Sequence, residues 1–401
     1  MNSYIIANPP CGIYKGDLSL GYAYYQTLLD IHSRFLKIFK KLKVICPKYS
    51  LNALGKRAEN IGLDGTIGDL NEYVKKWIKR GILRDRMNFS FEGNLLDTAP
   101  ESVRQAKTIF SNLHEKGYLL EKENVFYLDV KKIRNNFDLK SIIQEINFSS
   151  VRSKKEFLRI IEKLDEPVRI TKKRMYAVAN PLGGEEISPV FGISNLWEGY
   201  YNQEIDFMAA SEKELTRYLM LRFLSQVPTA NKLPMRNVFV YNHIMPEGGF
   251  GAWNMEELTR DGASSDSLRY SFAKSYSSSK QKTELKKNLL RGGRNLVYLA
   301  GNLKSFFLKE GFRFEDFPNI TEGEYLKKMN SFKYSLVLED LEMKLRKVSR
   351  DINVARDQGN LNLKKVEFFN IYITLVRKLS PFCPFVSKKA IRELTKYQRE
   401  Y

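Results

Sequence analysis

The chain has 401 residues, 43% of them hydrophobic and 12% aromatic, which is enough for a large buried core in two or three domains. No run approaches the roughly 18 consecutive apolar residues that a membrane helix needs, and the first residues lack the basic start and cleavage site of a signal peptide. We therefore expect a soluble cytoplasmic protein with no membrane partner.

The net charge and the cysteine positions indicate which partners and which covalent or metal sites to expect. A net charge of +20 attracts polyanions, so nucleic acid is the first partner to consider, although an AT-rich genome and a solvated surface would give the same lysine-rich composition. Cys11, Cys46 and Cys383 lie far apart and form no C-x-x-C pair. The sequence therefore has neither a disulfide framework nor a zinc knuckle, and we expect buried thiols.

Strands and helices alternate in the first part of the chain. An apolar run over residues 3–10 ends in two prolines and predicts a strand and a loop, and apolar residues at three- and four-residue spacing predict a helix from Leu18 to about Lys43. Residues 43–47 predict a second strand. A helix is expected over residues 99–117, between a Pro-Glu start and a glycine end, followed by a hairpin over 118–130.

The middle of the chain reads as an insertion followed by a second α/β half. Residues 131–166 are polar and helical in pattern, with no expected strand. A long helix is predicted over 212–227. Strand signals return at 174–181, 187–194, 204–211 and 237–244. Past about residue 285 the apolar periodicity is helical, which predicts an all-α bundle. Its expected loops are 317–324, 355–362 and 379–385.

Six segments occur in the order of signature segments of the class I aminoacyl-tRNA synthetases, and together they span nearly the whole chain. They are NPPCGIYKGDLSLGYAYYQTLLDIHSRFLKI (8–38), SVRQAKTIFSNLHEKGYLLEKENVFYLD (102–129), PVFGISNLWEGYYN (189–202), DGASSDSLRYSFAK (261–274), NLVYLAGNL (295–303) and LVRKLSPFCPFVSKKA (375–390). The chain most resembles the methionyl-tRNA synthetases, because its short insertion leaves no room for an editing domain.

This resemblance implies a fold and a set of domain boundaries. The fold class is α/β, a Rossmann-like parallel sheet with a short connective insertion, followed by an all-α anticodon-binding-type bundle. The family's metal-binding cysteines are missing from the insertion, so we expect no metal there. The implied boundaries are 1–117 and 169–245 for the two half-sheets, 118–168 for the insertion, 246–285 for a stem-contact linker and 286–401 for the bundle.

The residues that perform ATP-driven activation in that family are replaced. Ser19 and Tyr22 stand where the family's H-x-G-H signature has its two histidines, and only Gly21 remains of the signature. His32 lies about three helical turns further on and cannot substitute. Since removing one donor to transition-state charge typically costs about 10²- to 10³-fold in rate, we expect standard activation to be lost.

The second nucleotide signature is degenerate as well. The stretch that matches the family's K-M-S-K-S loop is EGGFGAWN, residues 247–254, and it contains no lysine. The serine-rich segment KSYSSSK, residues 274–280, could serve as a displaced phosphate loop, but we favour a solvated linker. The acidic G-x-D position of the second half is replaced by AASEKE, where Glu212 could supply the carboxylate.

A ligand pocket is expected at the carboxyl ends of the strands. Its candidate residues are Asn8, Pro9, Lys15, Tyr22, Asn195, Trp197 and Glu212. No cofactor is assigned with certainty, but ATP or an aminoacyl adenylate is compatible with the family. The alternative for the aromatic residues is that they fill space left by lost ATP contacts, which we favour for Phe191.

Three functions remain open on the sequence. The first is a protein that binds tRNA or aminoacyl-tRNA without adenylation. The second is a repurposed enzyme of specialised metabolism that moves an aminoacyl group from aminoacyl-tRNA or an adenylate to a small-molecule amine, hydroxyl or amino acid. A small amino-acid-like ligand is a possible partner beside tRNA or aminoacyl-tRNA. The third is a divergent methionine-tRNA ligase, which robust pyrophosphate exchange with methionine would establish. The sequence identifies neither the amino acid, the tRNA nor the oligomeric state.

Overall fold

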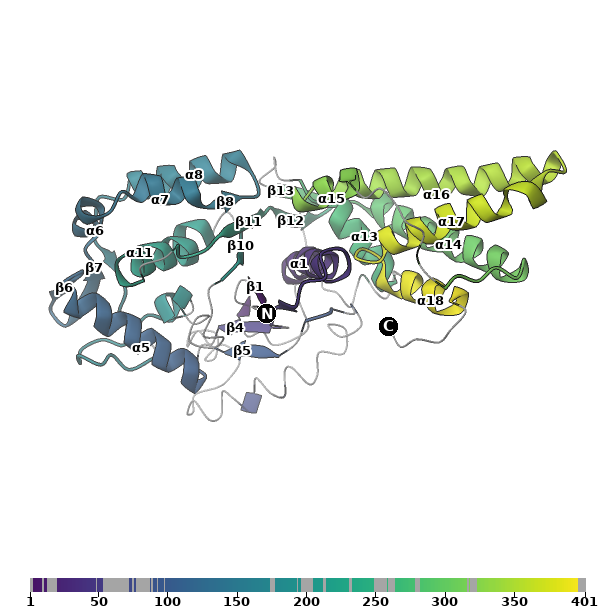
Figure 1. Ribbon diagram of the computed structural model, residues 1–401. Coiled ribbons are helices and arrows are strands. Elements are labelled where there is room, and N and C mark those ends of the chain that lie inside the picture. Colours follow the sequence, from purple (N-terminus) through teal and green to yellow (C-terminus); the bar gives the residue numbers. More distant parts are fainter. Residues whose placement is uncertain are drawn as a thin grey trace.

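A computed structural model gives the fold of most of the chain. The residues that it describes are 3–8, 11–12, 20–47, 49–52, 72–73, 76, 87, 89–91, 93–96, 98–173, 177–192, 194–195, 205–211, 214–230, 233–248, 258, 264–277, 282–315, 317 and 323–395. A five-stranded parallel sheet lies in the middle, with the insertion at one end and the helical bundle at the other (Figure 1). The predicted α/β half followed by an all-α bundle is confirmed.

The central sheet is built from short apolar runs far apart in the sequence. In spatial order its strands are β3 (Val44–Ile45), β1 (Tyr4–Ala7), β10 (Phe207–Ser211), β11 (Asn237–Tyr241) and β8 (Asn147–Phe148). Alternate side chains enter opposite cores: Ile6 and Phe207 face one side, whereas Ile5 and Met208 face the other. Both faces are covered, which is why the middle residues of β1, β10 and β11 are apolar.

Different helices cover the two faces. The first face packs on α1 (Leu20–Phe39), which is buried on nearly all sides between the sheet and the bundle. The second face packs on α5 (Pro100–Glu115) and α11 (Met220–Thr229), the latter preceded by a π-helical turn, η1 (Leu215–Leu219). The predicted helices over 18–43, 99–117 and 212–227 are therefore confirmed in place.

The predicted hairpin is formed by β6 (Leu119–Lys122) and β7 (Val125–Leu128). Its turn residues, Glu123 and Asn124, both have positive φ, as a two-residue type I′ turn requires. The strand β9 (Val168–Arg169) joins the hairpin. Three helices lie between β7 and β9 in the chain: α6 (Val130–Asn136), α7 (Leu139–Glu145) and α8 (Val151–Glu162). The strand β8 was not expected in this segment, yet it forms one edge of the main sheet.

Two predicted strands are wrong. Over residues 174–181, of which the structure describes 177–181, Val178 makes only an isolated bridge to Ile187. Residues 187–194 were expected to form a strand, but residues 189–192 and 194–195 are helical, and the Gly192 N–H donates to the Ser188 carbonyl. Proline is favoured in the first turn of a helix, where its missing N–H is not needed, so Pro189 starts a helix rather than a strand. Phe191 is fully buried and packs edge-on against Phe110, which confirms its predicted packing role.

The remaining elements connect the sheet to the bundle. There are two small parallel sheets among the described residues. One consists of β2 (Cys11–Gly12), β4 (Tyr49–Asn52) and β5 (Asn94–Leu96), and the other of β12 (His243–Pro246) and β13 (Lys282–Leu285). The helices are α13 (Ser265–Ser275), α14 (Lys287–Lys309), α15 (Gly323–Asn330), α16 (Tyr334–Asp357), α17 (Leu361–Leu379) and α18 (Pro384–Leu394). Within the described ranges, no helix is long and apolar enough to cross a bilayer.

Candidate functional site

The carboxyl ends of β1, β10 and β11 meet at one edge of the sheet, because all three strands are parallel. Asn8 follows β1, Ser211 ends β10 and Tyr241 ends β11. The helix after β1 covers one face and the helices after β10 cover the other. The strand order thus reverses between β1 and β10, which is where open α/β sheets bind ligands.

Tyrosine side chains crowd this edge on the α1 side. The Tyr22 ring packs edge-on against Tyr25 at 4.9 Å between centroids, and Tyr25 stacks on Tyr241 at the same distance. On another side of α1, the Tyr24 hydroxyl donates to Asn242 Oδ1 at 2.5 Å. Tyr22, which the sequence resemblance places at a signature histidine position, is only 4% exposed. It is therefore part of a packed aromatic cluster.

Glu214 completes this cluster and was missed in the sequence. Its Oε2 accepts the Ser211 N–H at 2.6 Å and the Tyr241 hydroxyl at 2.7 Å. The segment SEKE has the S-x-x-E spacing of a capping box, in which the glutamate reaches back to the backbone N–H at the helix start. That local signature could have singled out Glu214 instead of Glu212. Burial raises the pKa of Glu214, and burial next to this carboxylate raises the pKa of Tyr241.

The raised pKa of Glu214 makes stability depend on pH. The folded state holds this proton more tightly than the unfolded state, so its contribution is full below the unfolded pKa and is lost as pH rises through the folded pKa. Glu214→Gln keeps an acceptor for both donors without the charge. We expect urea unfolding to give equal stabilities for variant and wild type near pH 4, and a variant more stable by about 1 kcal/mol at neutral pH.

Glu156→Gln is the matched control for that measurement. A hydrogen bond from Arg159 lowers the pKa of Glu156, so this variant should lose stability relative to wild type as pH rises. A Glu214→Gln effect that is the same at both pH values would contradict the assignment.

The structure brings together only some of the predicted site residues. Asn8 and Tyr22 lie in the layer between the sheet and α1, and Gly21 is in the first turn of α1, where an added Cβ would meet no atom within 4 Å. Asn195 lies on the other face, where its Oδ1 accepts from Ser225 and Gln226 of α11. Pro9, Lys15, Ser19, Trp197 and Glu212 fall outside the described residues.

A buried ion pair ties the site helix α1 to the bundle. Asp30 and Arg269 are both fully buried and lie 2.7 Å apart, and Asp30 also accepts from Arg34 at 2.7 Å. Arg269 donates to the backbone carbonyls of Pro381 at 2.8 Å and Phe382 at 3.0 Å, between α17 and α18. We call this set the junction cluster. It holds the sheet and the bundle in one orientation.

A groove on the bundle, which we call the bundle groove, lies where α13, α14 and α18 meet. Its volume is about 930 Å³. Tyr298 and Phe385 stand in it with exposed rings, 73% and 49% accessible. The basic residues that line it are Lys304, Lys388, Lys389 and Arg392. Arg291 and Arg294 are exposed on α14, seven and four residues before Tyr298, so they extend the same helix face. Asp266 also lines the groove, and Lys304 is paired with Glu393 at 2.5 Å. The exposed positive charge of the groove therefore comes from Lys388, Lys389 and Arg392, beside aromatic surfaces.

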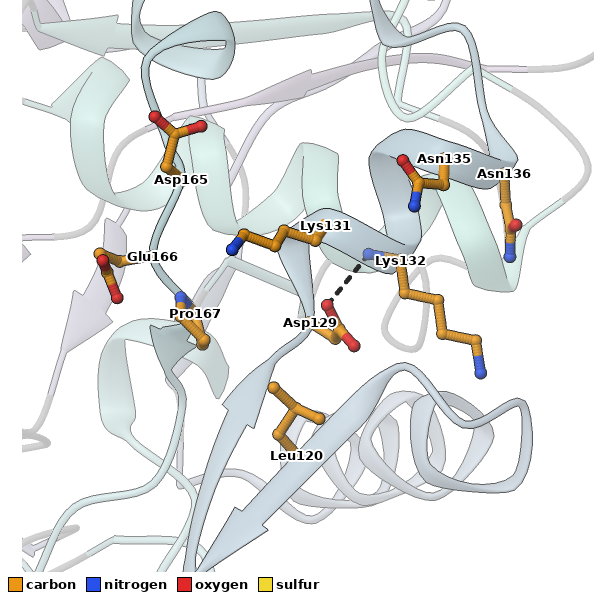
Figure 2. Close-up of a pocket in the computed structure, with 9 residues that line it drawn as sticks. All are labelled: Leu120, Asp129, Lys131, Lys132, Asn135, Asn136, Asp165, Glu166 and Pro167. Atoms are coloured by element: carbon orange, nitrogen blue, oxygen red, sulfur yellow. Dashed lines mark hydrogen bonds between the residues drawn. The ribbon is translucent and has the colours of Figure 1, made fainter.

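A second hollow, in the insertion, has a different character. Figure 2 shows its nine lining residues, with Lys131 extending toward the segment that contains Asp165. Two of the three carboxylates there have structural partners: Asp129 accepts the Lys132 N–H at the start of α6, and Asp165 pairs with Arg134 at 3.1 Å. In the described part of the chain, no three His, Cys, Asp or Glu side chains are grouped to hold a metal. This hollow is a structural surface feature.

The split sheet with its insertion and terminal bundle defines the fold of the class I aminoacyl-tRNA synthetases. Solved structures that are similar to this chain include two of methionyl-tRNA synthetase from Mycobacterium tuberculosis. One holds methionyl-adenylate and matches with a TM-score of 0.77 at 11% identity over 98% of this chain and 93% of that one. The ligand-free form matches with a TM-score of 0.72 at 12% identity, over 98% and 91%. No protein-family model and no curated protein sequence matches.

Proposed function

We propose that this protein binds tRNA or aminoacyl-tRNA and does not activate an amino acid with ATP. The observation that carries the proposal is the bundle groove. Lysine and arginine side chains there can neutralise phosphates, and the exposed rings of Tyr298 and Phe385 can stack on bases. The net charge of +20 favours encounter with RNA over long distances. The similar structures belong to proteins named for tRNA, which agrees with this partner.

The loss of activation rests on the signature positions. Ser19 and Tyr22 replace both histidines, and the segment 247–254 has no lysine. Neither serine nor tyrosine carries the positive charge that stabilises a transferring phosphate group. Tyr22 is also packed among aromatic rings, so its hydroxyl does not stand in an open nucleotide site. These features support a scaffold that has kept RNA binding after losing adenylation.

One experiment tests both parts of the proposal. RNA that copurifies with the protein at low salt is sequenced, and ATP–pyrophosphate exchange is measured with each of the common amino acids. We expect enrichment of tRNA, binding that weakens steeply with salt, and no exchange above background. Exchange with methionine would instead establish a ligase, and absence of RNA affinity at low salt would refute the binding proposal.

A further inference from the structure

Helix α16 presents a regular row of side chains to solvent along the upper edge of the bundle in Figure 1. On the side opposite its buried residues, six positions recur at alternating four- and three-residue spacing, and each is exposed or half-exposed. This spacing is the one by which helices pair lengthwise. We call the set the α16 stripe. It consists of Leu336, Asp340, Met343, Lys347, Arg350 and Val354.

The apolar members of the α16 stripe lie at its middle and at its two ends. Met343 is 62% exposed, and Leu336 and Val354 are each 45% exposed. Single exposed apolar residues are ordinary, but three on one helix face form a surface that a second helix would cover. A hollow of about 450 Å³ lies beside the middle of the stripe, and its lining includes Met343, Lys347 and Arg350. The stripe thus has room for a helix along its side.

The order of the side chains is complementary to itself when the stripe is read backwards. In an antiparallel pair of identical helices, two residues meet when they are equally far from the midpoint. With the midpoint at Leu345, every stripe residue meets another one of suitable chemistry. The contacts are Leu336 with Val354, Asp340 with Arg350, and Met343 with Lys347. Each occurs twice by symmetry, so the pair would contain two apolar ends, two ion pairs and two lysine stems that pack on Met343.

Parallel pairing of the same stripe is disfavoured by charge. Each residue would then meet its own copy, so Asp340, Lys347 and Arg350 would each face a like charge. Like charges at half of the contacts oppose association. The sequence of the stripe therefore selects the antiparallel direction.

The charged groups that would form the two ion pairs are accessible. The Arg350 side chain is 73% exposed, and its Nε lies 4.0 Å from Asp351, at the limit of an ion pair. Asp340 accepts from Lys328, but its side chain remains 40% exposed. A second cation can therefore approach Asp340, and Arg350 gains a closer carboxylate than the one that it has within the chain.

Like charges near the symmetry axis limit the strength of this pairing. Lys344 and Arg346 flank the stripe there, and each would approach its own copy. Arg346 is compensated by Glu342 at 2.7 Å within the chain. The stripe is about 27 Å long, so one helix pair falls toward the small end of protein interfaces. We therefore expect a reversible association rather than a permanent one.

We propose that two copies of this protein associate by antiparallel pairing of their α16 stripes, with the two-fold axis beside Leu345. Arg350 of each copy would pair with Asp340 of the other. The residues that line the bundle groove belong to other parts of the chain, so this contact leaves the groove open. Self-association and RNA binding therefore hold or fail separately.

Sedimentation equilibrium on the full-length protein, freed of RNA by nuclease and high-salt chromatography, measures the association. We expect the mass to rise from monomer to dimer between about 1 and about 200 µM. Met343→Lys should weaken the dimer at least about tenfold, because it places an unpaired charge against Lys347 of the other copy. Met343 is exposed in the monomer, so the melting temperature of the dilute variant should match that of wild type.

A charge exchange tests the pairing itself. Arg350→Asp alone should weaken the dimer, and adding Asp340→Arg should restore it, because each ion pair is then re-formed with its charges reversed. Lys364→Asp makes the same change of charge at an exposed position of α17 and should leave the dimer unchanged. Failure of the double variant to recover, or an equal loss with Lys364→Asp, would show that charge acts without this geometry.

Thiol cross-linking tests the direction of the helices. Leu336→Cys and Val354→Cys proteins are treated with a short bismaleimide, separately and mixed, with wild type as the background. We expect a cross-link in the mixture only, since two copies of residue 336 would lie about 27 Å apart. Cross-links in the separate samples, a monomer at every concentration, or a dimer that Met343→Lys does not weaken would overturn the proposal. A stripe that instead contacts RNA would leave the RNA-free protein monomeric.

Discussion

Replacing Arg269 with methionine should lower the free energy of unfolding by about 3 to 5 kcal/mol, the usual cost of removing one partner of a buried ion pair. The change leaves Asp30 buried with less compensating charge, and it removes the donors to the Pro381 and Phe382 carbonyls. Urea unfolding, followed by circular dichroism, measures the loss. Methionine matches much of the volume of arginine, so the effect reports on charge and hydrogen bonding rather than on a cavity.

The same variant should change the response to acid. Burial acts to raise the pKa of Asp30, but Arg269, Arg34 and the Ser90 N–H together lower it below its usual value. The stability that this carboxylate supplies is therefore present above its unfolded pKa, near 3.9, and is lost as pH falls through the folded pKa. The difference between wild type and Arg269→Met should shrink in acid.

Lys274→Met provides the control on the same helix. Lys274 pairs with Glu339 at 2.7 Å at the surface, where an ion pair contributes about 0–1 kcal/mol. A loss of less than about 1 kcal/mol for Arg269→Met, similar to that of the surface variant, would show that the junction cluster does not hold the two parts together.

Reversing the charge of Lys388 and Lys389 together should weaken RNA binding about 100-fold at low salt. Both residues are exposed on α18 in the bundle groove. Removing two phosphate contacts should also reduce the slope of log K against log salt by about 2. Filter binding or fluorescence anisotropy with copurifying tRNA at several salt concentrations measures both quantities.

A second charge reversal distinguishes the groove from general attraction. Lys131→Glu with Lys132→Glu changes the net charge by the same amount in the insertion. We expect that pair to change affinity by no more than about threefold, since charges beyond a Debye length from the RNA are screened. Equal losses in both double variants would mean that RNA is attracted by net charge alone and not held in the groove.

Much of the architecture could be predicted because it is encoded locally. The periodic apolar residues of α1, α5 and the bundle helices are visible in short windows, as is the glycine after α5. The turn between β6 and β7 consists of Glu123 and Asn124, which lie between alternating apolar positions. Both have positive φ, which asparagine adopts more readily than glutamate. Each of these elements needs no knowledge of a distant partner.

The errors arose where a short pattern fits two structures. An apolar run of about eight residues is compatible with a strand or a buried helix, and Pro189 was the overlooked sign of a helix start. Glu214 was not predicted, because the family resemblance points to Glu212 as the substitute for a family carboxylate. Gln26, which is buried without a hydrogen-bond partner among the described residues, has no sequence signature at all, since a glutamine on a helix is ordinarily solvated.

The junction cluster has a consequence for the order in which the protein folds. Two partners of Arg269, Asp30 and the Met87 carbonyl, are synthesised before it. The other two, the Pro381 and Phe382 carbonyls, are synthesised more than a hundred residues after it. Domains form largely in the order of synthesis, but a contact set of this sequence separation closes only when its final member has left the ribosome. Until then the Arg269 guanidinium lacks the Pro381 and Phe382 carbonyls. Formation of the α17–α18 connection is thus the last step in closing the junction cluster.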